Sequence, residues 1–540
     1  MALSTSTEPV IDLPTITAAP GGATTTVVGF DPEDPDASPW TVTANPTRSA
    51  MLAGNEVIPY IRSDKLFPDI VAAIRTATSG QHFIWIVGWN LSDATTHGGP
   101  GTGLVLVPGD ATTSILNLFT TADTAGVRIR MMLFRHDTAS NARDNSELVA
   151  FVQGLPNGMA VLDDRVVVGA GSLSSYIPGA PAGAHYVGSH HQKIIVVSGS
   201  EGLVAFQGGY DLDADRISLG GGPGLHDVHS RIRGPSAKSL AEAIRERWND
   251  RPGLATAQLL PVVATQPTFP DDKSVQIAHT FPNPNKHAIN GGVAYGFAPA
   301  GEITVKQLLL KAISTARQFI YVEDQYLFDM DISNALRAAL PNIQKLLILI
   351  VGSGSIEAET LQPWARRKAF IDNLPASYTV TPASAGPPPT AARATYTGKV
   401  AVCQLASQYV HAKTWIFDDK FAVIASANVN RRGMSHDSEQ AAGIYDPNHA
   451  RRWFFAHELR MNLWGKHFRR PPIDFRDPLA SSVHWFTPIG DVIPYNPDGG
   501  TDTDPKGLNK LGLTGLTRAA VSLILTNNLV WDSIVDPDGT

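Results

Sequence analysis

One pattern occurs twice in the chain, and this internal repeat constrains the fold more than any other feature. In the first copy, a His-x-Lys triplet at 191–193 is followed by an apolar run, a turn, a second apolar run and the loop GGYD at 208–211. In the second copy, the triplet at 411–413 is followed by the same succession and the loop SANVN at 426–430. No other His-x-Lys triplet occurs in the sequence. Two β-hairpins of one design are therefore expected.

The repeat extends upstream of both triplets. In each half an amphipathic segment precedes a first apolar run, and a second apolar run follows before the triplet. The first runs lie at 82–89 and 319–328, and the second runs at 127–134 and 345–351. Alternating helix and strand patterns predict an α/β fold. We therefore expect two duplicated α/β/α sandwich halves, packed about a pseudo-twofold axis with the active site between them.

The residue types in the repeated motif suit a phosphate group. Side chains two residues apart on an extended segment leave by the same face. His411 and Lys413 should therefore lie together, as should Ser426 and Asn428 where the second strand of the hairpin ends. An imidazole, an ammonium, a hydroxyl and a carboxamide then converge on one small volume.

The chain resembles the phospholipase D superfamily, and in detail the phosphatidylcholine-type enzymes of plants, animals and fungi. The second motif matches the family signature HxKxxxxD…GSxN from His411 to Asn428, except that Ala425 stands where the family has glycine. Further matches spread from about residue 54 to about residue 470. They are WIVGWNLS at 85–92, HHQK at 190–193, GGYDL at 208–212, HDVH at 226–229, YVEDQYLF at 321–328 and HDSE at 436–439.

The resemblance implies the catalytic roles. His191 would attack phosphorus and form a phosphohistidine, while His411 would act as general acid and then as general base; sequence symmetry alone does not choose between them. Asp227 would pair with His411 and fix its tautomer, although a structural Asp at a strand edge is the alternative. By the duplication, Glu439 is expected to orient His191. Lys193 and Lys413 would neutralise charge on the phosphoryl oxygens.

Further residues are expected to bind substrate or to support the site. The matched positions predict substrate contacts for Asn428, Ser426, Gly209, Asp211 and Gln325. Asp418, in the turn of the second hairpin, is expected to be structural.

The first motif departs from the family at its last position. Ser198 stands where the family has Asp, in a turn that is longer than the second one. Because the resemblance implies that this Asp supports the hairpin, we expect activity to survive, and Glu201 is a candidate substitute. The alternative is a decayed first site in an inactive phospholipid-binding protein.

Charge and composition narrow the substrate class. The net charge is −7 with dispersed Lys and Arg residues, so no basic face indicates a nucleic-acid partner. A nuclease or another phosphodiesterase on the same scaffold remains the alternative. No further His, Asp and Glu cluster at metal-ligand spacing is visible, so we expect neither metal nor cofactor. The resemblance implies hydrolysis of phospholipids at a membrane surface to phosphatidic acid, with transfer to alcohols as a second reaction.

The chain is divided by composition into five segments. We expect an extended or disordered arm at 1–50, a first half at 51–251, a linker at 252–292, a second half at 293–470 and an extension packed on the core at 471–540. The extension should include an apolar helix at 511–527. Neither a signal peptide nor a membrane span is apparent, which leaves the cytoplasm or non-classical export open, with peripheral action on membranes. A monomer is expected because one chain holds both motifs.

Overall fold

The structure is a computed structural model. It describes residues 38–42, 48–91, 103–136, 145–172, 184–217, 224–270, 273–352, 364–374, 378–381, 393–396, 398–447 and 453–495. Most of the predicted arm at 1–50 and all of the predicted helix at 511–527 lie outside these residues.

One large mixed sheet runs through the molecule. Its strands before residue 252 are β1 (Met51–Tyr60), β2 (Phe83–Gly88), β3 (Arg128–Phe134), β4 (Gly158–Asp163), β7 (Ile194–Gly199), β8 (Gly202–Gly208) and β9 (His229–Arg233). The later strands are β10 (Lys273–Phe281), β11 (Glu302–Ile303), β12 (Phe319–Asp324), β13 (Lys345–Ile350), β16 (Val400–Leu405), β17 (Thr414–Phe417), β18 (Phe421–Ala425), β19 (Glu439–Tyr445) and β20 (Val492–Pro494). Two small hairpins pair β5 (Val168–Ser172) with β6 (Ala184–Tyr186), and β14 (Tyr378–Thr381) with β15 (Arg393–Tyr396).

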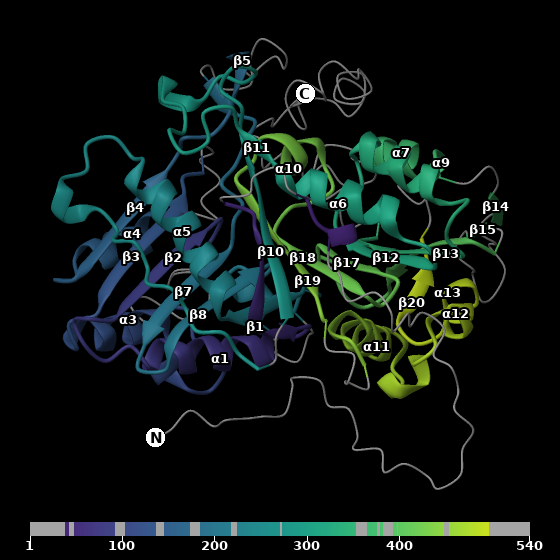
Figure 1. Ribbon diagram of the computed structural model, residues 1–540, viewed down its shortest axis with the longest axis horizontal. Coiled ribbons are helices and arrows are strands. Elements are labelled where there is room, and N and C mark those ends of the chain that lie inside the picture. The colour runs from purple at the N-terminus through teal and green to yellow at the C-terminus, as the bar shows by residue number, and fades with distance from the viewer. Residues whose placement is uncertain are drawn as a thin grey trace, which may run out of the picture.

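The strand order of the large sheet is nearly palindromic. It reads β20-β16-β13-β12-β17-β18-β19-β10-β1-β9-β8-β7-β2-β3-β4. In the first half, from β1 to β9, strands β4, β3 and β2 are parallel and continue into the antiparallel set β7, β8 and β9. In the second half, from β10 onward, β16, β13 and β12 are parallel and continue into antiparallel β17, β18 and β19. The duplicated α/β architecture predicted from sequence is confirmed, and Figure 1 shows the two halves side by side.

The segment predicted as a linker contains a central strand of the sheet. Residues 252–292 contain β10, which pairs antiparallel with β1 on one side and with β19 on the other. The nine-residue strand is buried along almost all of its length. Strands β1 and β10 therefore join the two halves in one continuous sheet. The division of the chain into domains remains a prediction.

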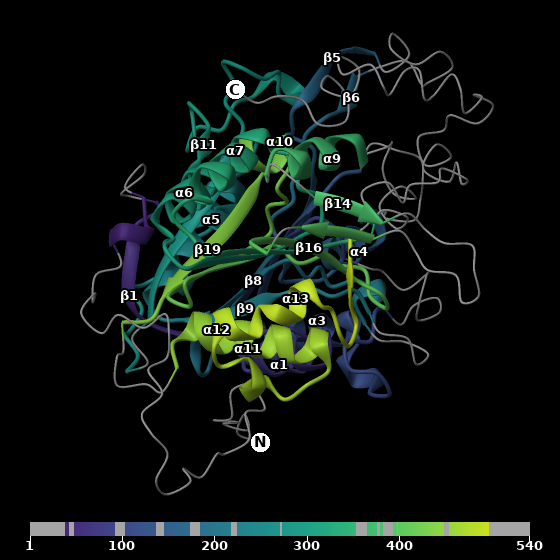
Figure 2. The ribbon, with the colours of Figure 1, turned by 90° about the vertical axis from the view of Figure 1, so that its right-hand side faces the viewer.

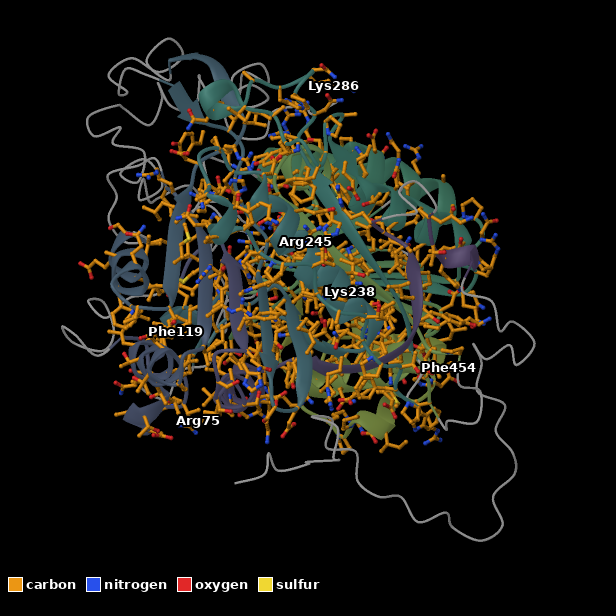
Figure 3. The ribbon with its side chains drawn as sticks, turned by 60° about the vertical axis from the view of Figure 1, so that its left-hand side comes forward. Arg75, Phe119, Lys238, Arg245, Lys286 and Phe454 are labelled. Atoms are coloured by element: carbon orange, nitrogen blue, oxygen red, sulfur yellow. The ribbon has the colours of Figure 1, made fainter. Side chains whose placement is uncertain are left out.

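Helices cover both faces of the sheet, as Figure 2 shows. The longer ones in the first half are α1 (Ser63–Arg75), α3 (Ile115–Thr124), α4 (Ser146–Gln153) and α5 (Pro235–Asn249). Those in the second half are α6 (Thr304–Thr315), α7 (Met330–Ala339), α9 (Trp364–Asp372), α10 (Arg431–Ser435), α11 (Phe455–Phe468), α12 (Pro478–Ser481) and α13 (Val483–Phe486). In Figure 3, Arg75 marks α1, Phe119 marks α3, and Lys238 and Arg245 mark α5.

Three large apolar cores result from this layering. One lies between α1, α3, α4 and the first half of the sheet, and another between α6, α7, α9 and the second half. The third is shared, because α5 packs on strand residues such as Trp85 while α11 packs on residues such as Tyr321 within the same cluster. Burial of apolar surface at roughly 25 cal/mol per Å² therefore couples the halves to each other. Within the described part of the chain, no helix combines the length and apolarity needed to cross a bilayer.

Two predicted elements end or begin at different residues in the structure. The strand predicted at 319–328 ends at Asp324, because its carboxylate accepts hydrogen bonds from the backbone N–H groups of Tyr326 and Leu327 and turns the chain. Leu327 takes a φ of 59°, which an extended strand does not allow. The apolar run at 345–351 forms β13, which ends one residue earlier, at Ile350.

Candidate active site

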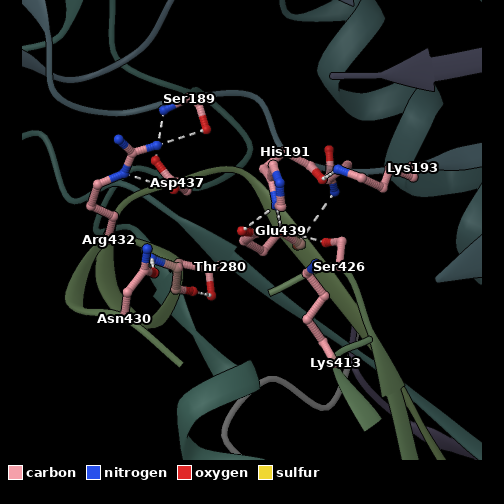
Figure 4. Close-up of polar contacts among 12 residues, drawn as sticks. Ser189, His191, Lys193, Thr280, Lys413, Ser426, Asn430, Arg432, Asp437 and Glu439 are labelled. Atoms are coloured by element: carbon pink, nitrogen blue, oxygen red, sulfur yellow. Dashed lines mark hydrogen bonds and ion pairs between the residues drawn. The ribbon is translucent and has the colours of Figure 1, made fainter. Parts of the chain in front are cut away.

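The first imidazole is held by a carboxylate from the other half. His191 lies just before β7, and its Nδ1 is 3.0 Å from Oε1 of Glu439, the first residue of β19. The backbone fixes this pairing, because His191 N donates to the Ser438 carbonyl and Ser438 N donates to the Ser189 carbonyl, both at 2.9 Å. Figure 4 shows His191 and Glu439 in contact at the centre of the site.

The second imidazole has the mirror-image arrangement. His411 lies just before β17, and its Nδ1 is 2.6 Å from Oδ2 of Asp227, which precedes β9. Backbone bonds again hold the two segments together, since His411 N donates to the His226 carbonyl at 2.7 Å and His226 N donates to the Tyr409 carbonyl at 2.9 Å. Each histidine is therefore paired with a carboxylate from the opposite half, as the duplication and the resemblance predicted.

A lysine accompanies each imidazole. Lys193 Nζ donates to the carbonyl oxygen of His191 at 3.0 Å and lies 3.4 Å from Asp211 Oδ2. Lys413 Nζ donates to the carbonyl oxygen of His411 and, at 3.3 Å, to Oε1 of Gln325. Both ammonium groups are almost fully buried. They place two positive charges beside the imidazoles, where they are shielded from solvent.

Residual exposure indicates where substrate enters. The side chains of His191 and His411 are 12% and 8% exposed, whereas those of Glu439 and Asp227 are 1% and 0% exposed. In both rings Nδ1 contacts the carboxylate, so Nε2 is the nitrogen left to meet a ligand. The site thus opens at the two imidazoles and closes at the carboxylates behind them.

Burial sets the protonation of these pairs. It raises the pKa of Asp227 to about 7 and of Glu439 to about 7, even though Lys413 and Lys193 respectively act against it. Burial also lowers the pKa of His191 and of His411 well below the usual value, and the nearby lysines add to this effect. Without substrate the imidazoles are therefore neutral. A bound phosphodiester anion would favour the charged imidazolium and raise the pKa of a histidine beside it.

The two pairs belong to one site. The charge of His191 lowers the pKa of His411, and Lys413 lowers the pKa of His191, so each half lies in the electric field of the other. Burial, followed by the opposing attraction of Asp227, leaves the pKa of Lys413 at about 8. Figure 4 shows Lys193 and Lys413 approaching Glu439 from opposite halves.

Two residues predicted to contact substrate, Ser426 and Gln325, form hydrogen bonds with other protein side chains. The Ser426 hydroxyl donates to Oε2 of Glu439, and it also accepts a hydrogen bond from the Gln440 backbone N–H at 3.0 Å. Gln325 binds Lys413 through Oε1 and donates from Nε2 to the Tyr409 hydroxyl at 2.7 Å. These contacts favour positioning roles for Ser426 and Gln325. Substrate contact by either residue remains a prediction.

Asn428 and Gly209 have different local roles. Asn428 Oδ1 is a buried acceptor with no hydrogen-bond partner among the described residues, and contact of the Asn428 amide N–H group with substrate remains a prediction. Gly209 allows the backbone to approach Asp227, because a Cβ at this position would lie 2.0 Å from Asp227 Oδ1. Its role is therefore steric, and direct contact of Gly209 with substrate remains a prediction.

The two hairpin turns are held by different contacts, which explains how the first motif can lack the carboxylate of the second. Asp418 accepts hydrogen bonds from the backbone N–H groups of Arg317, Gln318 and Phe319 at 2.7 to 2.9 Å, one strand length away from His411. These bonds join the turn to the start of β12 and favour a structural role. In the first half Ser198 is instead paired with Phe83 in the sheet. Glu201 is exposed and binds Arg233 through its carbonyl oxygen, so the expected substitution of its carboxylate for Asp is wrong.

Sequence reasoning missed two residues that border the site. Arg216 is 2% exposed, and its Nη2 lies 3.7 Å from Asp211 Oδ2. Trp89 packs edge-on against His191 with 5.9 Å between ring centroids, and Lys193 Nζ is 5.8 Å from its centroid. Arg216 is the only basic residue in the acidic stretch DLDADR. Its proximity to Lys193, twenty-three positions earlier, arises from the tertiary structure.

A buried His/Glu cluster lies behind Asp227 and corrects the expectation that no such group exists. His226, Glu323 and His467 offer ligand atoms within 4.8 Å of one another. Hydrogen bonds account for the geometry: His226 Nε2 and His467 Nε2 donate to Glu323 at 2.7 and 2.8 Å, and Lys466 Nζ donates to His226 Nδ1 at 2.6 Å. All three are fully buried, and an ammonium adjoins one of them. A polar network that braces the Asp227 segment fits these contacts better than a cation site does.

Fold and site together define a duplicated α/β protein with two His-Lys sets and crossed carboxylates. The family model described as Phospholipase D matches residues 382–484, which contain the second set. Phospholipase D alpha 1 of Cynara cardunculus is 25% identical over 77% of this chain and 65% of its own length, and Phospholipase D alpha 2 of Oryza sativa subsp. japonica is 23% identical over 78% and 65%. The chain is therefore similar in sequence to phospholipase D proteins, and the family model covers its second His-Lys set.

The coverage of these relatives is partial. The chain spans about 65% of the length of the first curated proteins that it matches. Among solved structures, phosphatidylserine synthase of Haemophilus influenzae Rd KW20 aligns with 81% of this chain and 96% of its own, at 12% identity and a TM-score of 0.47.

Proposed function

We propose that this protein is a phospholipase D that hydrolyses the distal phosphodiester bond of a glycerophospholipid to phosphatidic acid and a free head-group alcohol. One observation carries the proposal: His191 and His411 are each held through Nδ1 by a carboxylate from the opposite half. Cleavage of a phosphodiester needs a nucleophile on one side of phosphorus and an acid at the leaving oxygen. Two oriented imidazoles in one site supply both.

In the first step His191 Nε2 attacks phosphorus. The N–P bond forms as the bond from phosphorus to the head-group oxygen breaks, and the His411 imidazolium gives its proton to that oxygen. Asp227 stabilises the imidazolium through Nδ1, and its 2.6 Å contact, shorter than the 3.0 Å contact of Glu439, supports His411 as the acid. Glu439 holds His191 in the tautomer that leaves the Nε2 lone pair free.

In the second step water replaces the protein nitrogen. Neutral His411 removes a proton from water, the oxygen bonds to phosphorus, and the bond between phosphorus and His191 Nε2 breaks. Phosphatidic acid leaves and both histidines return to their starting states. A primary alcohol in place of water would give a phosphatidyl alcohol by the same route.

Cationic and polar groups complement the phosphoryl oxygens. Lys193 and Lys413 are buried beside the two imidazoles, and Asn428 would donate from its amide N–H group to a phosphoryl oxygen. Charge that develops in the transition state is stabilised most strongly by groups already fixed in a poorly hydrated site. Both motifs are in one chain, so the proposed reaction needs no second subunit. Curated relatives named Phospholipase D alpha support the phospholipid assignment.

Head-group release from phosphatidylcholine vesicles tests the proposal, with and without ethanol. Choline release and phosphatidylethanol formation are expected from the wild type, and neither from His191→Ala or His411→Ala. Cleavage of single-stranded DNA without lipid turnover would instead identify a nuclease. Binding of phosphatidic acid vesicles without any turnover would identify an inactive lipid-binding protein.

A further inference from the structure

The two halves of the site differ in charge at one matched position. Asn428 follows β18 in the second half, whereas the first half has Asp211 after β8. A carboxylate at this position would repel the phosphoryl oxygens that a carboxamide can bind. Asp211 is 2% exposed, so solvent screens little of its charge.

Arg216 compensates for this charge by its position. Its Nη2 lies 3.7 Å from Asp211 Oδ2, and Lys193 Nζ lies 3.4 Å from the same oxygen. The other oxygen, Oδ1, accepts a hydrogen bond from the Asn90 backbone N–H at 3.3 Å. Arg216 is as deeply buried as Asp211, at 2% exposure. Asp211 therefore faces two cations and one backbone donor.

A count of formal charges shows what the guanidinium changes. The described groups around the imidazoles include the cations Lys193, Lys413 and Arg216, and the carboxylates Asp211, Asp227 and Glu439. Above the pKa of about 7 of Asp227 and of Glu439, where all three carboxylates are ionised and the imidazoles are neutral, these charges cancel. Without Arg216 the same set would be net negative before an anionic substrate arrives.

The field of Arg216 reaches both halves. It lowers the pKa of His411, after burial and Lys413, and it opposes the effect of burial on the pKa of Asp227. Arg216 also lowers the pKa of Lys413, in the second half.

We propose that Arg216 is a positioning residue that neutralises Asp211, so that Lys193 is free to attract the phosphate of the substrate. This inference rests on the proposed phosphodiesterase function. Asp211 and Arg216 form a charge-balanced substitute for the single neutral carboxamide that the second half uses.

A double-mutant cycle on Asp211 and Arg216 tests the inference. Arg216→Gln alone is expected to lower kcat/KM for phosphatidylcholine by about 100-fold, the size of effect seen when one fixed charge-stabilising group is lost. Asp211→Asn with Arg216→Gln restores the formal charge balance and should recover activity to within about 10-fold of the wild type. Arg216→Lys should retain more activity than Arg216→Gln because it keeps the charge.

Binding of inorganic phosphate, measured by calorimetry, provides a readout without turnover. Arg216→Gln should weaken phosphate binding, Asp211→Asn should strengthen it, and the double variant should bind near the wild-type affinity. If the variants show these changes in phosphate affinity but the wild type does not hydrolyse phosphatidylcholine, the proposed function is contradicted and the charge inference stands. A loss that is equal in Arg216→Gln and in the double variant would overturn the inference.

Arg460→Gln is the matched control. Arg460 is also fully buried, and it binds Asp419, in the turn between β17 and β18, through two nitrogens at 2.7 and 2.8 Å. Arg460→Gln should lower the melting temperature, and by the same amount whether or not Asp211→Asn is also present. If Asp211→Asn rescues Arg460→Gln as well as Arg216→Gln, the rescue is a general stability effect and the proposal fails.

Discussion

Asp227 belongs to the first half of the molecule, yet its carboxylate lies 2.6 Å from Nδ1 of His411 in the second half. The reciprocal contact joins His191 to Glu439 at 3.0 Å. Neither half therefore contains a complete imidazole-carboxylate pair. Orientation of both rings depends on the junction of the sheet, where β1, β10 and β19 lie side by side.

Removing either carboxylate charge should slow turnover. Asp227→Asn and Glu439→Gln are expected to lower kcat by about a thousand-fold, because an amide cannot stabilise the imidazolium or enforce its tautomer. Steady-state kinetics on phosphatidylcholine would show KM almost unchanged. A variant that lost affinity but kept kcat would show that its carboxylate binds substrate rather than orienting a ring.

The same substitutions should reveal a pH-dependent cost in stability. Burial raises the pKa of Asp227 from 3.8 to about 7, so the folded protein holds a proton there that the unfolded chain releases. The stability linked to this proton is present below about pH 4 and is lost as pH rises through 7. Each pKa unit corresponds to about 1.4 kcal/mol.

The melting temperature of Asp227→Asn minus that of the wild type should therefore increase as pH rises from 4 to 8. Thermal unfolding across that range measures the difference. Asp64→Asn is the control, since the Asp64 side chain is 51% exposed and solvent screens its charge. A stability difference between Asp227→Asn and wild type that stays constant over this range would contradict the buried-carboxylate account.

Gly209→Ala should impair catalysis by displacing Asp227. The new Cβ would lie 2.0 Å from Asp227 Oδ1, so the carboxylate must move away from His411. We expect kcat to fall toward that of Asp227→Asn while the charge is retained. Gly202→Ala is the control: Gly202, unlike Gly209, has a positive φ of 92°, but a Cβ there meets nothing within 4 Å. Its substitution should cost about 1 kcal/mol of stability and leave kcat unchanged.

The two hairpin turns should respond differently to truncation. Asp418→Ala removes the acceptor of three backbone hydrogen bonds and should destabilise the protein by about 2 to 4 kcal/mol. Ser198→Ala should change stability by less than about 1 kcal/mol, because Ser198 is held by sheet pairing. Denaturant titration compares them. Equal losses would mean that Ser198 supports its turn as Asp418 does.

Chelation tests the buried network behind Asp227. Because His226, Glu323 and His467 bind one another directly, EDTA is expected to leave both turnover and melting temperature unchanged. Metal analysis of the purified protein is the second measurement. A melting temperature that falls on dialysis against EDTA and recovers with a divalent ion would assign these three residues to a metal.

The repeated motif made much of the architecture predictable. A motif that occurs twice predicts two similar halves, and an imidazole that needs a carboxylate partner directs attention to the acidic positions Asp227 and Glu439. The placement of β10 was not predictable in the same way. Its sequence KSVQIAHTF lies between Asp272 and Pro282 in a Pro- and Thr-rich region, and its burial comes from two neighbouring strands that are far away in sequence.

Side-chain roles were harder to predict than side-chain neighbourhoods. Ser426 and Gln325 lie at the site as expected, but their polar atoms bind Glu439 and Lys413. The sequence contains no information on which of several nearby acceptors a hydroxyl will choose. Arg216 was missed because an isolated arginine among acidic residues usually indicates a solvated loop, whereas here it is 2% exposed.

The position of β10 has a consequence for dissecting the molecule. A chain cut between α5 and β10 would give one fragment with His191 and Asp227, and another with His411 and Glu439. Each piece would keep one imidazole and the wrong acid, along with an unpaired strand edge where β1 and β10 once met. Such pieces should act only by complementation, as an obligate heterodimer whose turnover rises with the concentration of the scarcer fragment.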